Sequence, residues 1–481
     1  MKIIPFEQLG GVGDGDIHTG AGTDNANAFD LAVKAGESGD SVEFAKGKQY
    51  KTTRQIPIHN MSWTGDMADP PVIFGWFTSR GKRIIGRSRE QEMKKASISG
   101  LRFHRCGPHA EHGILIDNMA AFDFDGWITA SAAADGEIRG GAIGVSAFQP
   151  NNRPSKNVNV KARLSNSANF GVQYGNVSGG SIQVIAENCV REVIGIEPYC
   201  LGCKDFTAAQ VDSDSIQLIG HGLSPAHPLI YARMDAKEGV EGLPRANYWF
   251  VIVVDSDHIR LASSKEDAVA GKAAQLGRVP LGTHRLFTCG VTKNIRIHDS
   301  RINNLNPPTE SWARGLDGVV VFTATSGGYV ENIEIKNVKI RDFANRAPGY
   351  CVSWLGLWDL DITGFELYGG RIGGIRVGKG TLNGLRNSSG ELITPKTPTV
   401  VTPRGGSVRG NVIRDFPRYG ISVLAGTAVV RDNRGSSAAK GSVGFDSLRS
   451  QGSQLATEQG GNNFTVPNGL PYRARVLKEP R

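Results

Sequence analysis

The sequence predicts an all-β protein whose main body is a right-handed parallel β-helix, a solenoid of short strands stacked rung upon rung, with an N-terminal capping helix and a small inserted β domain. Two observations carry this prediction. Glycine supplies 62 of the 481 residues, above its usual share of about 7%, which suits a chain that turns sharply many times. Short segments of alternating apolar residues also recur along the chain, as is typical of repeat architectures.

The recurring unit joins two short predicted strands. In the first strand an asparagine precedes the alternation, as in Asn294-Ile295-Arg296-Ile297. In the second strand a glycine precedes it, as in Gly374-Ile375-Arg376-Val377. The unit returns every roughly 20–40 residues, the range expected of solenoids, and its period of two places Ile and Val inside. A β-sandwich also has many short strands, but it would lack the repeated asparagine.

The first 50 residues predict a helix followed by a strand. Asp24 or Asn25 can cap a helix whose apolar face is Ala28, Phe29, Ala32 and Val33 and which ends at Gly36. A strand follows from residue 41 to residue 44. We expect this helix to cover the open end of the solenoid, because an uncovered first rung would expose apolar surface and strand edges.

This segment also resembles a known family. It contains Gly13-Asp14-Gly15, Thr23-Asp24-Asn25, Ala28-Phe29 and the strand with Val42 and Phe44, and it resembles the N-terminal signature of pectate-lyase-like β-helix proteins, phage tailspikes and capsule depolymerases among them. The motif spans roughly residues 6–50; the rest of the resemblance depends on the repeat. The resemblance implies a polysaccharide-cleaving protein, a homotrimer, contact with other phage tail proteins, and a place on a virion tail or outside the cell.

The repeat is interrupted once, between about residues 204 and 288. This stretch contains Asp214-Ser215-Ile216-Gln217-Leu218, a long apolar run from Tyr248 to Val254, and a short helix candidate from Ser264 to Ala268. It resembles a small β module inserted in phage tail and adhesin-like proteins. We therefore expect a cap and first rung over residues 1–55, solenoid over 56–203, an insert over 204–288, and solenoid again over 289–481.

Charge and composition restrict the function. The formal net charge of +9 suits an anionic partner, either nucleic acid or acidic polysaccharide. Because no nucleic-acid-binding motif or basic run is found, we expect no nucleic-acid partner. No apolar run is long enough to span a membrane, and the N-terminus lacks the apolar core of a signal peptide, so we expect synthesis in the cytoplasm without membrane insertion.

Candidate catalytic residues follow from stacking the rungs, which brings outward side chains into columns about 4.8 Å apart. Aligning the glycine-led strands gives one column of Gln173, Glu197, Val320, Arg376 and Ser422. Glycoside hydrolysis commonly needs two carboxylates. We expect Glu197 and Asp317, on consecutive rungs beside the insert, to supply them, with Glu310 in reserve.

Residues around this pair are candidates for binding the substrate. Tyr199, Trp312 and Trp354 can stack on sugar rings, and Arg314 and Arg376 can hold substrate carboxylates. Asp359 and Asp361, with Trp358, lie one or two rungs further on.

Lyase chemistry is the alternative to hydrolysis. β-Elimination needs a base and a group that stabilises charge on a uronate carboxylate, and Arg376, Arg314 and Tyr199 are suitable. A tail protein or adhesin that holds glycan without cutting it is the alternative from another class, and a structural spike component is a third.

Cofactors are not expected. His109, Glu111 and His112 follow Cys106, but their spacing is not that of a standard zinc site, so no metal is predicted. Cys200 and Cys203 form a CxxC at the start of the insert, and Cys289 lies at its end. The sequence leaves open whether these cysteines form a disulfide or a thiol cluster, and cytoplasmic synthesis favours reduced thiols.

Overall fold

The structure of the protein is a computed structural model. It describes residues 1–58, 60–77, 82–86, 95–106, 110–130, 142–146, 153–166, 171–189, 192–244, 247–303, 318–342, 349–382, 385, 391–395, 399–440, 442–447, 457–458, 461–467 and 472–473.

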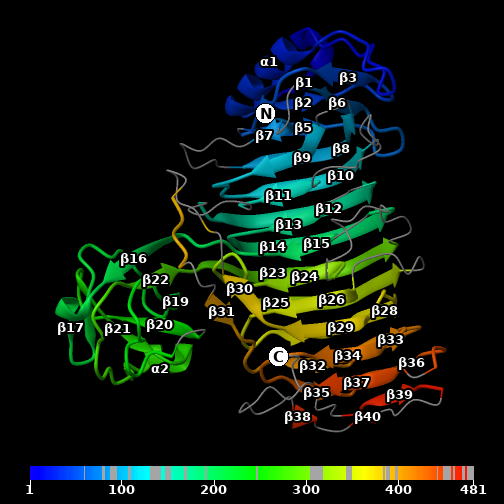
Figure 1. The fold of residues 1–481 in the computed structure, drawn as a ribbon. Coiled ribbons are helices and arrows are strands. Elements are labelled where there is room, and N and C mark those ends of the chain that lie inside the picture. The colour runs from blue at the N-terminus through cyan, green and yellow to red at the C-terminus, as the bar shows by residue number, and fades with distance from the viewer. Residues whose placement is uncertain are drawn as a thin grey trace.

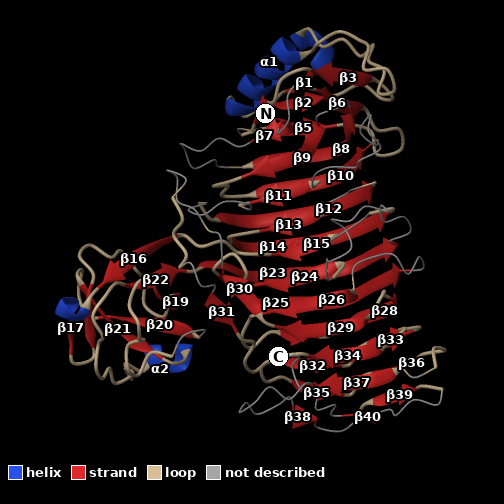
Figure 2. Cartoon of the chain, viewed as in Figure 1, coloured by secondary structure: helices blue, strands red, loops and turns tan. Residues whose placement is uncertain are grey.

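The main body is a parallel β-helix built from long sheets that run along the molecule (Figures 1 and 2). Sheet 1 contains β1 (Ile3–Pro5), β2 (Ser41–Glu43), β3 (Gln49–Thr52), β5 (Ser62–Thr64), β6 (Val72–Trp76), β8 (Ala96–Cys106), β10 (Phe122–Ala130), β12 (Ser155–Ser165), β14 (Val177–Glu187), β23 (Gly290–Asn303), β25 (Gly328–Asp342), β28 (Phe365–Gly369), β33 (Val412–Arg414), β36 (Arg434–Ser436) and β39 (Asn463–Thr465).

Sheet 2 supplies the second strand of each rung. It contains β4 (Ile56–Pro57), β7 (Lys82–Gly86), β9 (Ala110–Ile116), β11 (Ile143–Val145), β13 (Val172–Tyr174), β15 (Ile194–Ile196), β24 (Val320–Thr323), β26 (Tyr350–Leu355), β29 (Gly373–Gly378), β34 (Tyr419–Val423), β37 (Val443–Ser447) and β40 (Tyr472–Arg473). Strands of both sheets pair in parallel with the strands of the rungs before and after them.

Smaller sheets complete the later rungs. A parallel sheet contains β27 (Asp361–Ile362), β32 (Ser407–Arg409), β35 (Val429–Arg431) and β38 (Thr457–Glu458). The strands β30 (Gly380–Leu382) and β31 (Thr399–Val401) pair antiparallel. Within the described residues, no helix is long and apolar enough to cross a membrane.

Alternation with period two builds the core, as the sequence predicts. In β12 the side chains of Val158, Val160, Ala162 and Leu164 are buried, and the residues between them face outward. The backbone conformation explains the asparagines that recur along the predicted strands. Asn294 and Asn332 have φ of 57° and 52°, a left-handed conformation that asparagine tolerates better than most residues, and they mark the same bend on consecutive rungs.

The helix α1 (Ala26–Glu37) lies at the N-terminal end of the solenoid (Figure 1). Its buried residues are Ala28, Phe29, Ala32, Val33 and Gly36, so the predicted helix and its apolar face are confirmed. A 3-10 helix, η1 (Phe6–Leu9), precedes it, and the ring of Phe6 lies 4.8 Å from that of Phe29. Of the two predicted caps, Asn25 makes none, because its amide bonds the backbone of Val12, whereas the Asp24 carboxylate accepts from the backbone N–H of Ala26 at 3.2 Å.

The segment between β15 and β23 forms a sheet of its own beside the solenoid, which we call the small sheet (Figure 1). Its antiparallel strands are β16 (Gly202–Phe206), β17 (Val211–Asp212), β18 (Ser215–Gln217), β19 (Pro228–Arg233), β20 (Tyr248–Val253), β21 (His258–Ala262) and β22 (His284–Thr288). It also carries η2 (Ala208–Gln210) and α2 (Lys265–Val269). The side chain of Ser264 caps α2, so the predicted short helix is confirmed.

One face of the small sheet packs on the solenoid, and the other covers a separate core. Tyr248 and Phe250 belong to the same continuous core as the rungs, whereas Trp249 and Val251 pack with Phe206 and Leu261 in a core of their own. The hydroxyl of Tyr248 donates to the Gly328 carbonyl at 2.6 Å, and its ring meets those of Tyr329 and Trp358 edge-on. The small sheet is therefore anchored to the solenoid along a buried face.

Candidate active site

Glu197 lies just after β15, at the point where the chain leaves sheet 2 for the small sheet. Its carboxylate accepts hydrogen bonds from the Gln173 amide and from the Ser326 hydroxyl, both at 2.8 Å. Gln173 is completely buried and Glu197 is partly buried. Because β15 pairs with β24, the rung of Glu197 is followed directly by the rung of β24, as the sequence predicts.

The predicted register of the outward column is wrong at two positions. Gln173 pairs with Gly195, not with Glu197, and Gly195 pairs with Val321, not with Val320. Val320 belongs to the buried inward column. Gly195 lies within β15 rather than before it, which displaces Glu197 by two residues. Gly318 lies two residues before Val320, whereas Gly374 lies one before the equivalent Ile375, which displaces Val320 by one. Arg376 and Ser422 do share the outward column, because they pair directly.

The other predicted site residues have mixed outcomes. Glu310, Trp312, Arg314 and Asp317 lie outside the described residues. Tyr199 is partly buried, and its backbone N–H donates to Asn176 at 2.9 Å. Trp354 is completely buried and its indole N–H donates to the Leu357 carbonyl. The expectation that Trp354 stacks on a sugar is therefore wrong, because its ring has no exposed face.

Arg376 lies on β29, between Ser353 and Ser422 of the neighbouring rungs. Burial lowers the pKa of its guanidinium, although from so high a value that the group keeps its charge at neutral pH. The side chain therefore retains the charge that binding a substrate carboxylate requires.

A first cleft, which we call the Asp359 cleft, lies between α2 of the small sheet and the later rungs of the solenoid. Its volume is about 360 Å³, and its lining residues are Phe250, Ser263, Ser264, Lys265, Glu266, Tyr329, Val330, Glu331, Asn332, Trp358, Asp359 and Arg404. The sequence places Asp359 and Trp358 one or two rungs beyond the predicted catalytic pair and gives them no role. It does not reveal Glu266, Glu331 or Arg404, because no sequence pattern indicates which rungs α2 faces.

Asp359 differs chemically from the other carboxylates of this cleft. Burial, with the nearby negative charge of Glu266, raises the pKa of Asp359, and Arg404 only partly opposes this. Glu331 is neutralised by Lys265 at 2.6 Å and by Lys293 at 3.9 Å. Glu266 is exposed and forms no ion pair within the described part of the chain. The cleft thus combines a carboxyl whose pKa is raised with a carboxylate that has no ion pair within the described residues.

An aromatic and a cationic group complete this cleft. The guanidinium of Arg404 lies over the Trp358 ring, 5.1 Å from its centre, and the indole N–H of Trp358 donates to the Thr402 carbonyl. Burial raises the pKa of the Tyr329 hydroxyl well above its usual value, so this group stays neutral and can donate a hydrogen bond.

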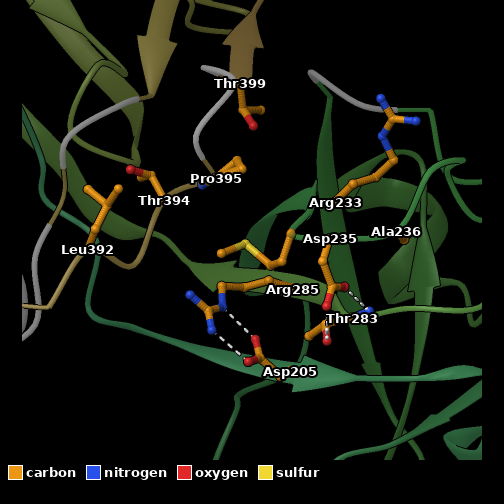
Figure 3. Close-up of a pocket in the computed structure, with 11 residues that line it drawn as sticks. Asp205, Arg233, Asp235, Ala236, Thr283, Arg285, Leu392, Thr394, Pro395 and Thr399 are labelled. Atoms are coloured by element: carbon orange, nitrogen blue, oxygen red, sulfur yellow. Dashed lines mark hydrogen bonds and ion pairs between the residues drawn. The ribbon is translucent and has the colours of Figure 1, made fainter.

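A second and larger cleft, the Arg285 cleft, lies between strands β16, β19 and β22 of the small sheet and the segment that leads into β31 (Figure 3). Its volume is about 750 Å³, and it is lined by Asp205, Arg233, Met234, Asp235, Ala236, Thr283, Arg285, Leu392, Thr394, Pro395 and Thr399. Arg285 pairs through two nitrogens with Asp205 and also donates to the Ile393 carbonyl at 2.7 Å. It thereby ties the small sheet to the segment before β31.

The carboxylates of the Arg285 cleft are poorly suited to acid catalysis. The pairing of Asp205 with Arg285 neutralises its charge and raises the pKa of the arginine. The Thr283 backbone N–H donates to Asp235 and lowers the pKa of that carboxyl. A general acid must hold a proton near the working pH, so this cleft is better suited to binding than to chemistry.

The cysteines at the base of the small sheet are free thiols. Cys200 and Cys289 are buried, and burial raises the pKa of Cys200 to about 12. Cys203 is partly buried. Within the described residues no group of three or more potential metal ligands is found. The sequence left a disulfide open for these cysteines, but in the structure they are reduced thiols.

Comparison with known proteins gives structural similarity only. The Dettilon tailspike protein matches with a TM-score of 0.41 and 11% identity, over 97% of this chain and 68% of that one. An exopolygalacturonase of Yersinia enterocolitica matches with a TM-score of 0.41 and 10% identity, over 98% of this chain and 79% of that one. PfbA, a surface adhesin of Streptococcus pneumoniae, matches with a TM-score of 0.41 and 12% identity, over 97% of this chain and 92% of that one. No protein-family model matches the chain, and no curated protein is similar in sequence.

Proposed function

We propose that the protein is a polysaccharide depolymerase that hydrolyses glycosidic bonds with paired carboxylates in the Asp359 cleft. The observation that carries this proposal is the difference between Asp359, whose pKa is raised, and Glu266, which has no ion pair within the described part of the chain; both residues are exposed. Two carboxyl groups in different surroundings are the usual basis for assigning an acid and a base.

Each group then has a defined role. Asp359 donates its proton to the leaving glycosidic oxygen, and Glu266 acts as the base or nucleophile on the opposite side of the sugar ring. Arg404 and Lys265, which also line the cleft, bind the anionic groups of the substrate. The small sheet supplies Glu266 and Lys265, so the reaction needs both walls of the cleft.

A second set of carboxylates remains a proposal for the same reaction. Glu197 and Asp317, with Glu310 in reserve, form this set. The support is the setting of Glu197, whose carboxylate is partly buried and held by two donors. Such a fixed carboxylate suits a nucleophile or base. β-Elimination, with Arg376, Arg314 and Tyr199 as its residues, is the alternative chemistry.

The same proposal covers the wider setting of the protein. We propose that α1 caps the solenoid, that the small sheet is an inserted domain, and that the substrate is a bacterial surface or extracellular polysaccharide. A homotrimer on a virion tail or outside the cell fits the N-terminal motif. A glycan-binding protein without catalysis is the alternative from another class.

The test is to incubate the protein with acidic and neutral bacterial polysaccharides and to follow reducing ends together with the ultraviolet absorbance of unsaturated products. New reducing ends without absorbance indicate hydrolysis, and both signals together indicate a lyase. No signal from a polysaccharide that the protein binds would contradict catalysis and favour the binding protein.

Variants distinguish the two sets of carboxylates. Asp359→Asn and Glu266→Gln should each lower kcat/KM by roughly 100-fold or more, the usual cost of losing a general acid or base. Glu197→Gln, Asp317→Asn and the control Asp235→Asn should stay near the wild-type value. If Glu197→Gln and Asp317→Asn abolish activity while Asp359→Asn does not, the catalytic carboxylates are the second set.

A further inference from the structure

The outward face of sheet 1 carries two columns of side chains that the catalytic proposal does not use. Strand pairing stacks the first column as Arg102, Trp127, Arg163, Ile185, Arg301, Lys339, Glu366, Val412 and Arg434. The second, two residues further along each strand, includes Glu187, Asn303, Arg341, Tyr368, Arg414 and Ser436. We call these two columns the cationic face.

The charge of this face is strongly one-sided. Its cations are Arg102, Arg163, Arg301, Lys339, Arg341, Arg414 and Arg434, and its carboxylates are Glu187 and Glu366. The strands lie about 4.8 Å apart, so the first column runs for roughly 40 Å along the solenoid axis. A row of this length matches an extended polyanion better than a small ligand.

Several of these cations have no counterion among the residues that the structure describes. Arg163 is paired with Asp125 at 2.9 Å, and Lys339 with Glu366 at 3.1 Å. Arg301, Arg341 and Arg414 are exposed and form no ion pair within the described part of the chain. Uncompensated arginines in a row raise the local potential and attract anions, and each can form paired hydrogen bonds with a carboxylate or sulfate.

Aromatic rings hold the arginines in place. The guanidinium of Arg163 lies 4.6 Å from the centre of the Trp127 ring, and those of Arg341 and Arg414 lie 5.1 and 5.7 Å from that of Tyr368. Because two guanidinium groups contact Tyr368, its ring is poorly available for a stacked base, which is how single-stranded nucleic acids are usually bound. This arrangement favours a polysaccharide that carries carboxylate or sulfate groups.

The face is also hollowed at its centre. A depression of about 380 Å³ is lined by Ile185, Arg301, Lys339, Gln183, Asp299, Ser300 and Asn337. The side chain of Ile185 is 44% exposed, so an apolar patch lies between the cations of neighbouring rungs. Apolar contact beside charged hydrogen-bond donors suits a sugar ring that bears an acidic substituent.

We infer that the cationic face is a second binding surface, separate from both clefts, which holds an extended anionic polysaccharide along the solenoid axis. The inference rests on the proposed function, since it names the substrate class as acidic glycans, and it adds a surface that keeps the polymer on the protein between cleavage events. The face contributes no group to the chemistry, so binding and cleavage are separable.

The test measures binding of the full chain to polygalacturonate, with neutral dextran as the comparison polymer, over a range of salt concentrations. The variant Arg301→Gln/Arg341→Gln/Arg414→Gln removes three exposed cations from the face. The control variant Lys34→Gln/Lys272→Gln/Arg278→Gln removes three exposed cations elsewhere. Melting temperatures of both variants establish that they are folded.

We expect the face variant to raise the Kd for polygalacturonate at low salt at least about tenfold and to flatten its salt dependence, because fewer counterions are released. The control variant should change the Kd less than about twofold. Cleavage of a short oligosaccharide should be equal in all three proteins, whereas Asp359→Asn should lose cleavage and keep polymer binding, which separates the two proposals.

Three results would overturn the inference. The first is equal weakening in both variants, which would show only an effect of net charge. The second is no binding of polygalacturonate by the wild-type chain. The third is tighter binding of single-stranded DNA than of polygalacturonate, with the same loss in the face variant, which would assign the surface to nucleic acid.

Discussion

At the scale of single residues, Asp359 is the proposed general acid of its cleft. Its backbone has a φ of 53°, and aspartate and asparagine are among the few residues other than glycine that tolerate this conformation. Asp359→Asn therefore keeps the turn while removing the proton. By its accessible surface the residue is exposed, although the partial burial of its carboxyl and the charge of Glu266 raise its pKa.

This raised pKa predicts a stability effect with a definite sign. The folded protein binds the Asp359 proton more tightly than the unfolded chain does, so ionisation destabilises the fold as the pH rises through the folded pKa. Asp359→Asn cannot ionise, and its melting temperature should exceed that of the wild type at pH 7. The difference should vanish near about pH 3, below the unfolded pKa of an aspartate.

Asp235→Asn is the matched control, with the opposite sign. The Thr283 N–H lowers the pKa of Asp235, so this carboxylate stabilises the fold at neutral pH, and the contribution is lost as the pH falls through the folded pKa. Its asparagine variant should melt below the wild type at pH 7. Melting curves at both pH values check both signs, and a lower melting temperature for Asp359→Asn at pH 7 would contradict the environment assigned to Asp359.

At the scale of elements, stacked asparagines join the late rungs. Asn411 donates to Asn433 at 3.0 Å, and Asn433 donates to Asn462 at 3.0 Å. The Asn433 amide also donates to the Val408 carbonyl, and its oxygen accepts the Asn411 backbone N–H. Asn411 and Asn433 are completely buried, so their polar atoms depend on this ladder for hydrogen bonds.

Asn433→Ala should therefore destabilise the protein by about 2–4 kcal/mol, because several buried hydrogen bonds are lost and their partners are left unsatisfied. Denaturant unfolding measures this change. Asn463→Ala is the control, since Asn463 lies on the neighbouring rung and is exposed, and it should cost less than about 0.5 kcal/mol. Equal effects of the two substitutions would show that the ladder adds nothing particular to stability.

At the scale of the whole molecule, the small sheet and the solenoid share one core. Tyr248 and Phe250 of the small sheet pack against Tyr329, and Tyr248 also meets Trp358. Lys265 adds an ion pair to Glu331 across the same contact. We therefore expect the small sheet to unfold together with the rungs that it contacts.

Tyr248→Ala tests this coupling. The substitution removes a completely buried aromatic ring, which typically costs about 3–5 kcal/mol. Calorimetry should show the main transition of the solenoid shifted to lower temperature as a whole. A new, separate transition at low temperature, with the main one unmoved, would show that the small sheet unfolds alone.

Local patterns were enough to predict the architecture. The alternation of Ile and Val with period two, the asparagine at several bends and the face of α1 all depend on residues close together in the chain. The interruption of the repeat predicts an insert over residues 204–288, and the small sheet runs from Gly202 to Thr288. By contrast, the register of Glu197 was missed by two residues, because Gly195 lies within its strand rather than before it.

The sequence by itself thus determined that this chain forms a parallel solenoid with an interruption, since each rung repeats the same local preferences. Only the tertiary structure decided which side chains share a cleft or a face. Glu266 and Asp359 are far apart in the chain and meet because the small sheet folds back on the solenoid. The cationic face likewise exists because stacking aligns arginines from separate rungs. Such contacts depend on how packed elements are placed, which no local pattern encodes.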